Sequence, residues 1–129
     1  MSIAVDTNVV VRILVEDDPD QAITAHDVLA RGFIVTTSVL LETEWLLRSK
    51  YSWPRATIAA ALRDILDMPS LRSAPDNILW AIDRFAAGAD FADMVHLVTA
   101  NSASGFATFD RRLAKQAGAG SPLSIETLT

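Results

Sequence analysis

Short apolar runs alternate with longer amphipathic segments along this 129-residue chain, and this alternation constrains the fold more than any other feature. Apolar runs of about four to eight residues bounded by turn residues are typical of buried strands, whereas an apolar stripe of helical period is typical of a helix. We expect strands at residues 2–5, 33–36, 71–73, 105–109 and 123–126. Strands separated by helices predict a parallel central sheet of four to five strands inside a three-layer α/β/α fold.

The helical segments carry their own start and stop signals. Asp18 is followed three residues later by Gln21, which is typical of a helix N-terminus, and Gly32 indicates where that helix ends. Pro75 predicts the start of another helix, which ends before Gly88.

Composition narrows the chemistry. The chain has no cysteine, which excludes disulfides, thiolate nucleophiles and Cys-ligated metals, and its two histidines make a His-rich zinc site improbable. Sixteen Asp and Glu residues supply the oxygen ligands that Mg²⁺ or Mn²⁺ prefers. Eleven Lys and Arg residues leave a net charge of -5, so nucleic-acid binding cannot rest on overall charge.

No linker, repeat or low-complexity block interrupts the chain, and we expect a single domain over residues 1–129. No Lys or Arg precedes the apolar stretch at residues 1–15, and Asp6 interrupts it, which does not fit a secretory signal. The longest uncharged stretch contains several polar residues, so it cannot span a bilayer. We therefore expect a cytoplasmic protein without membrane contact.

Two aspartates directly follow predicted strands. Asp6 ends the first apolar run, and Asp110 lies between the fourth run and a short predicted helix over residues 111–116. Ligands of parallel α/β sheets bind beyond the carboxyl ends of the strands, which makes both residues candidate site residues. Helix N-capping is the alternative explanation for each of them.

Two glutamates lie on the apolar helix predicted at residues 37–48. Glu44 has Arg48 four residues later, so a surface ion pair explains it adequately. Glu42 has Val39 and Trp45 as helical neighbours and no cation within a turn, so we expect its desolvation to require a metal or another positioned charge.

A further pair of acids, Asp90 and Asp93, opens the next predicted helix. Their spacing resembles a capping box, but both carboxylates then share one face and repel each other unless a cation is present. If these acids converge with those at the strand ends, divalent metal ions would neutralise them, and the predicted chemistry is metal-dependent phosphodiester hydrolysis.

The sequence also resembles the PIN-domain ribonucleases and, within them, the VapC toxins of toxin–antitoxin pairs. The resemblance covers nearly the whole chain and rests on four motifs in order, Val5-Asp6-Thr7-Asn8, Val39-Leu40-Leu41-Glu42 with Trp45-Leu46-Leu47, Ala89-Asp90-Phe91-Ala92-Asp93, and Thr108-Phe109-Asp110-Arg111 with Leu113.

The resemblance implies a Mg²⁺- or Mn²⁺-dependent endoribonuclease and assigns roles to its acids. Asp6, Glu42, Asp93 and Asp110 would be the catalytic, metal-binding acids, and Asp90 an accessory metal-binding acid. Asn8 and Thr108 would support the carboxylates by hydrogen bonding. It also implies an RNA substrate and a cognate VapB-like antitoxin, whose tail can place an Arg among the acids.

Other residues have two interpretations each. Arg111, Arg112 and Lys115 can hold RNA phosphates or be ordinary surface residues. His96, three residues after Asp93, can touch the site, although packing is the more common role of a helical histidine. The apolar segment around Trp45 predicts a homodimer and an antitoxin contact, with the residues Trp45, Leu46, Leu47 and Trp53.

Two alternatives to a toxin nuclease stay open. One is a PIN-like RNA-processing nuclease outside any toxin–antitoxin pair, and the other is a non-catalytic module whose acids accept Arg from a partner. The chain has no phosphate-binding loop, dinucleotide fingerprint, HExxH or GxSxG motif, which excludes the commonest NTPases, dehydrogenases, zinc proteases and serine hydrolases.

Overall fold

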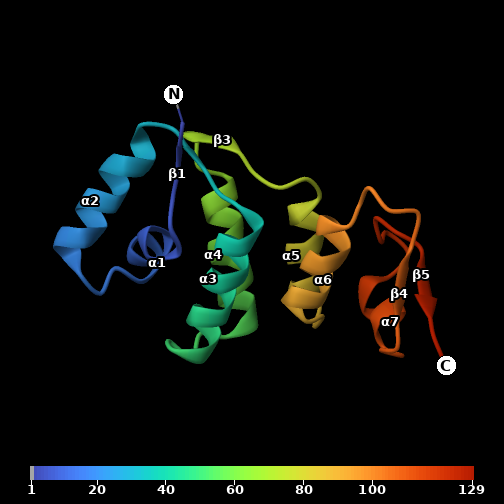
Figure 1. Cartoon of the computed structure of the whole chain (residues 1–129). Helices are drawn as coiled ribbons and strands as arrows, with labels where there is room; N and C mark the ends of the chain where they lie inside the picture. The colour runs from blue at the N-terminus through green and yellow to red at the C-terminus, as the bar shows by residue number, and fades with distance from the viewer. Residues whose placement is uncertain (1) are drawn as a thin grey trace. The chain divides into compact units, whose positions relative to one another are not determined.

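The computed structural model describes residues 2–129 and divides into two compact units, one ending at Pro75 and the other beginning at Asp76 (Figure 1). The first unit contains, in chain order, β1 (Ile3–Ala4), α1 (Thr7–Val15), α2 (Pro19–Ala30), β2 (Phe33–Ile34), α3 (Thr37–Ser49), α4 (Arg55–Leu66) and β3 (Leu71–Ser73). The second contains α5 (Ile78–Ala86), α6 (Phe91–Thr99), β4 (Phe106–Thr108), α7 (Leu113–Ala117) and β5 (Ile125–Thr127).

The sheet of the first unit is parallel and has β2 at its centre. Ile3 of β1 lies opposite Phe33 of β2, and Phe33 lies opposite Leu71 of β3. Phe33 is fully buried, whereas Ile3 on the edge strand is exposed. The central strand therefore belongs to the core, and the carboxyl end of β1 leads directly to Asp6.

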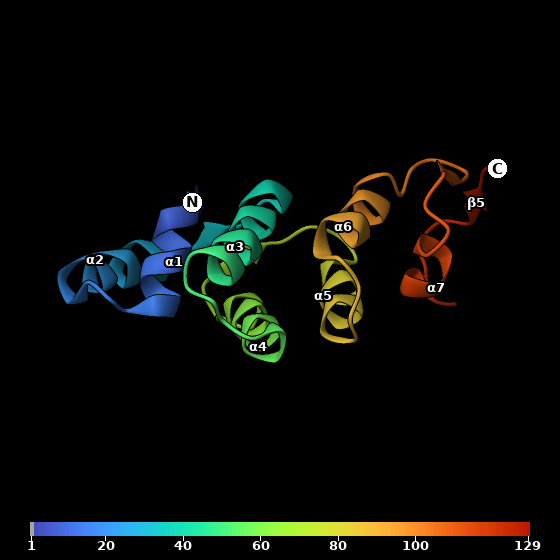
Figure 2. The ribbon, with the colours of Figure 1, turned by 90° about the horizontal axis from the view of Figure 1, so that it is seen from below.

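Helices pack beside one another around this sheet. In both views α3 lies alongside α4, and α1 contacts both α2 and α3 (Figures 1 and 2). The apolar stripes predicted from the sequence supply the core, which includes the buried side chains of Val10, Leu29, Leu40, Leu47, Ile58, Leu62 and Ile65.

The predicted signals for the helix at residues 19–30 are confirmed. The Asp18 carboxylate accepts the backbone N–H of Gln21 at 3.1 Å, and the helix ends at Ala30. Gly32 follows with a φ of +97°, a conformation that favours glycine, and a Cβ there would lie 2.9 Å from the Arg72 side chain. This glycine turns the chain into the central strand.

The second unit pairs two helices and a two-stranded sheet. Helices α5 and α6 lie side by side, with the rings of Phe85 and Phe91 in edge contact at 5.6 Å between centroids. Strands β4 and β5 are parallel, with Phe106 opposite Ile125. The fully buried Met94 and Leu97 of α6 belong to the core of this unit.

Within residues 2–129 the five predicted strands are all present and every pairing is parallel as expected, but they form a three-stranded and a two-stranded sheet, whereas one sheet of four to five strands was predicted. Two helix starts were predicted too early. Helix α5 begins at Ile78 because Asn77 has a φ of +59°, which no helical residue adopts. Helix α7 begins at Leu113 because the Asp110 carboxylate holds the N–H of Arg112 in a turn.

No helix in the described part of the chain is both long and apolar enough to cross a membrane.

Candidate active site

Asp6 lies where β1 ends and α1 begins. Its Oδ1 accepts the backbone N–H of Thr7 at 2.8 Å, and its backbone is extended, so it is the N-cap of α1. The side chain of Asp6 is exposed. Capping and ligand binding are compatible here, because the backbone hydrogen bond uses only one of the two carboxylate oxygens.

Asn8, the residue predicted to support Asp6, is exposed in the first turn of α1. It lines a hollow between α1 and α2 together with Arg12 and Gln21. The predicted hydrogen bond from Asn8 to a carboxylate stays a prediction.

The two glutamates of α3 have exchanged environments relative to the prediction: Glu44 is buried, and Glu42 is exposed. The buried stripe of this helix consists of Leu40, Thr43, Glu44 and Leu47, at the spacing of one helix face. Glu44 is therefore only 3% exposed, whereas Glu42 is exposed. The expectation that Glu42 lies on the buried apolar stripe was wrong, because its neighbour Trp45 is itself 54% exposed.

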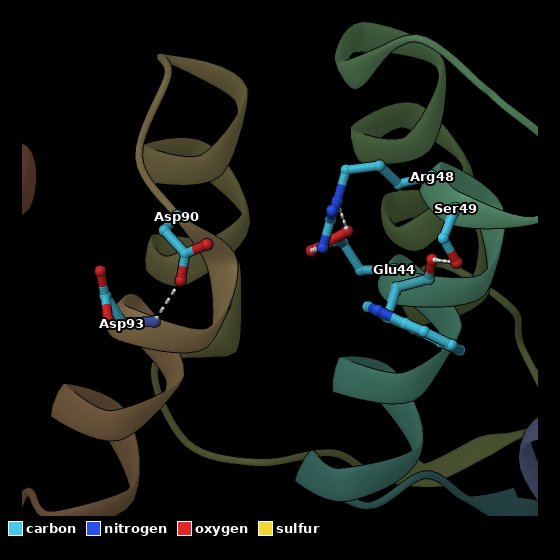
Figure 3. A network of polar contacts seen from close by, with 6 residues as sticks. Glu44, Arg48, Ser49, Asp90 and Asp93 are labelled. Atoms are coloured by element: carbon cyan, nitrogen blue, oxygen red, sulfur yellow. Dashed lines mark hydrogen bonds and ion pairs between the residues drawn. The ribbon is translucent and has the colours of Figure 1, made fainter.

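The predicted ion pair of Glu44 is confirmed, but the expected surface position is wrong. Arg48 Nε donates to Glu44 Oε2 at 2.9 Å, and the Arg48 side chain is about half exposed while that of Glu44 is buried (Figure 3). A buried carboxylate is costly unless a charged partner satisfies it. Glu44 is thus explained by a structural role.

We expect Glu44→Gln to destabilise the protein by about 1–2 kcal/mol, because the neutral amide cannot form the charge-assisted hydrogen bond with Arg48 that satisfies the buried carboxylate. The half-exposed position of the Arg48 side chain keeps the loss from being larger. Glu42→Gln should change the free energy of unfolding by less than about 0.5 kcal/mol, because that side chain is exposed. Urea unfolding of both variants makes the comparison. Equal stability of the two variants would contradict the structural role of Glu44.

Asp90 and Asp93 stand at the start of α6. Asp90 is its N-cap, and its Oδ2 accepts the backbone N–H of Asp93 at 3.0 Å, as Figure 3 shows. This confirms one half of the predicted capping box, the side-chain cap that Asp90 provides at the start of α6. Asp90 is exposed and Asp93 is half-buried.

Asp93 is partly buried and lies near two other acids. Burial raises the pKa of its carboxyl group, and the charges of Asp90 and Asp110 raise it further, while His96 and Arg112 act in the opposite direction. Asp90, Asp93 and Asp110 therefore form an acid group within the second unit, in which the ionised form of Asp93 is disfavoured. A bound cation would favour that ionised form.

Asp110 is held by the turn that follows β4. Thr108 Oγ1 accepts the backbone N–H of Asp110 at 3.0 Å, and Asp110 Oδ1 accepts the N–H of Arg112 at 2.9 Å. Arg112 Nε lies 3.7 Å from the same oxygen. The support that Thr108 gives to Asp110 thus acts through the backbone N–H.

The donor chemistry of these acids fits a hard divalent cation, since Mg²⁺ and Mn²⁺ take carboxylate oxygens. Among residues 2–129, no three His, Asp or Glu side chains are gathered into a ready metal-binding set. In the second unit, burial together with the charges of Asp90 and Asp110 raises the pKa of Asp93, and a cation held there would offset the repulsion among these three acids.

Of the two interpretations of His96, packing is wrong. It is exposed, and its charge lowers the pKa of Asp93, so it lies near the acid group. The spacing of three residues from Asp93, one helical turn, was the sequence signal for this position.

A comparison with protein family models identifies the family of this chain. The family model of the PIN domain matches residues 3–119, which include residues of both units and every candidate acid. The chain belongs to the PIN-domain family. The match and the parallel strands confirm the predicted three-layer α/β/α fold class.

PIN domains are generally nucleases and typically use divalent metal ions, so the family agrees with the chemistry expected from the acids. Comparisons with curated proteins and with solved structures gave no match.

Proposed function

We propose that this PIN domain is a Mg²⁺- or Mn²⁺-dependent endoribonuclease. Asp6, Glu42, Asp93 and Asp110 are the proposed metal-binding acids, with Asp90 as an accessory ligand. The observation that carries the proposal is the match to the PIN family over residues 3–119, together with the acid group of the second unit, in which burial and the charges of Asp90 and Asp110 raise the pKa of Asp93. Carboxyl groups whose pKa is raised by burial and by neighbouring charges cluster at functional sites.

A divalent ion held by these acids would polarise the scissile phosphate and lower the pKa of an attacking water. The chain's own residues position the acids and neutralise the RNA phosphates. The capping bond of Asp90 fixes the first turn of α6, and the Thr108 hydroxyl fixes the turn that carries Asp110. The exposed Arg111 and Lys115 supply positive charge for RNA phosphates beside acids that would otherwise repel them.

Incubation of the purified protein with single-stranded RNA tests the activity directly. We expect internal cleavage with Mg²⁺ or Mn²⁺ and none after chelation of the metal by EDTA. RNA that stays intact with either metal, while an Arg-containing peptide binds to the acids, would favour the non-catalytic binding module instead.

We propose further that the chain is the toxin of a two-component pair, with a VapB-like antitoxin as partner. This rests on the VapC-like order of the four motifs. A short antitoxin-like reading frame next to the coding sequence, together with growth arrest that its co-expression relieves, would support the pair. Cleavage without growth arrest would favour a PIN nuclease that processes RNA in another role.

A homodimer is also proposed, with Trp45 as its central contact. Trp45 is 54% exposed on α3 and Trp53 is half-buried, whereas Leu47 is fully buried and must be removed from the predicted contact surface. We expect Trp45→Ala to weaken the dimer by about 30-fold or more, as truncation of a central interface Trp does. Sedimentation velocity at micromolar concentrations measures this, and a parent protein that sediments only as a monomer would contradict the dimer.

A further inference from the structure

Phe109 is the most exposed large apolar side chain in the described part of the chain, with 73% of its surface accessible. It lies between Thr108 and Asp110, directly after β4. Single exposed apolar residues are common on protein surfaces, so exposure alone carries no inference. The position of Phe109 beside a proposed catalytic acid is what makes it informative.

The backbone on both sides of Phe109 is fixed. On one side β4 pairs with β5, and Thr108 lies opposite Thr127. On the other side the N–H of Asp110 is held by Thr108 Oγ1, and the N–H of Arg112 by the Asp110 carboxylate. A short turn with two such hydrogen bonds fixes the backbone from which the exposed ring projects, so less backbone entropy is lost when the ring binds a ligand.

Three cations follow this ring along the chain. Arg111 and Arg112 follow within three residues, and Lys115 follows on α7; all three are exposed, and the Arg112 side chain is 82% accessible. A chain with a net charge of -5 thus places three cations within the six residues that follow one exposed aromatic ring, of which Arg112 also lies 3.7 Å from the Asp110 carboxylate. An aromatic face next to cations is the combination that binds single-stranded nucleic acid, because bases stack on the ring and phosphates pair with the cations.

We propose that Phe109 stacks on a base of single-stranded RNA and thereby positions the phosphate next to that base at Asp110. This inference rests on the proposed nuclease function and deepens it by naming a specificity contact for the substrate. Phe109 is a positioning residue, because it touches the substrate base and takes no part in bond cleavage.

The test measures binding separately from cleavage. An Asp93→Asn background keeps the RNA intact, and fluorescence anisotropy of a labelled unstructured RNA oligonucleotide in the presence of Mg²⁺ gives the Kd. We expect Phe109→Ala to raise Kd by about 5- to 100-fold, the range for the loss of one stacked base. Phe109→Trp should bind as tightly as the parent, and Phe109→Leu should be nearly as weak as the alanine variant because it lacks a π face.

Two controls isolate the base contact. Leu79→Ala removes another exposed apolar side chain of the same unit and should leave Kd unchanged. An oligonucleotide with abasic sites should bind the parent and Phe109→Ala equally, because the cations and the phosphates are the same in both. Thermal unfolding should be unchanged by Phe109→Ala, since the ring is exposed.

The inference is overturned if Phe109→Ala binds intact RNA as tightly as the parent, or if Phe109→Leu does. It is also overturned if Phe109→Ala alters only the sedimentation of the protein, which would make the ring a protein contact. Failure of the proposed function is a separate result: the parent, with Asp93 intact, would bind RNA but leave it uncleaved with Mg²⁺ or Mn²⁺.

Discussion

Asp6→Asn, Glu42→Gln, Asp93→Asn and Asp110→Asn should each reduce metal-dependent RNA cleavage by at least about a hundredfold. Each substitution removes one charged oxygen ligand and almost no volume, and even residues that only orient a metal ligand are worth about 10- to 100-fold. Initial rates of cleavage of a labelled RNA at saturating Mn²⁺ measure the loss, and circular dichroism shows whether the fold is kept.

Glu44→Gln is the matched control for the acid on the same helix. Its carboxylate is buried and paired with Arg48, so we expect its activity to stay close to that of the parent at temperatures where the variant is folded. Full activity of Glu42→Gln together with loss of activity in folded Glu44→Gln would show that the other carboxylate of α3 serves the site.

Mn²⁺ or Mg²⁺ should raise the thermal unfolding midpoint of the protein. An ion that binds only the native state at about 100 times its Kd stabilises that state by about 2.7 kcal/mol, which for a chain of this size corresponds to about 10 °C. Burial and the charges of Asp90 and Asp110 raise the pKa of Asp93, and the cation would offset the part that is due to repulsion. Differential scanning calorimetry with and without the metal gives the shift.

The double variant Asp93→Asn/Asp110→Asn provides the control for this measurement. It lacks two of the three carboxylates of the acid group in the second unit and should gain little or nothing from Mn²⁺. A parent midpoint that does not move at millimolar Mn²⁺, without a calorimetric binding signal, would contradict the metal site.

The order of strands and helices was predictable because local signals agree with the tertiary structure. The alternation of apolar runs and amphipathic segments located all five strands within about two residues, and Asp18 caps its helix as the sequence indicates. The strand-end positions of Asp6 and Asp110 followed from the same pattern. The apolar pattern indicates which segments form strands. In a parallel α/β fold, ligands bind beyond the carboxyl ends of the strands, so the same pattern also indicates which loops can carry catalytic residues.

The environment of the two glutamates was not predictable in the same way. Helix α3 is apolar on most of its circumference, so the sequence does not define which stripe is buried, and the interpretation placed Glu42 there in place of Glu44. Packing against α1 and α4 selects the face with Leu40 and Leu47, and no local signal reports that choice. The start of α5 was missed for a similar reason, because the left-handed conformation of Asn77 overrides the signal of Pro75.

Three of the proposed site aspartates use only one of their two carboxylate oxygens to bind the backbone. Asp6, Asp90 and Asp110 each give one oxygen to a backbone N–H, at Thr7, Asp93 and Arg112 respectively. The second oxygen of each is the one that can meet a cation. An asparagine keeps the accepting oxygen and presents an amide NH₂ where the second oxygen stood, so it preserves the turn while it repels the ion. Folding and activity can therefore be altered independently at these positions, whereas an alanine would remove both at once.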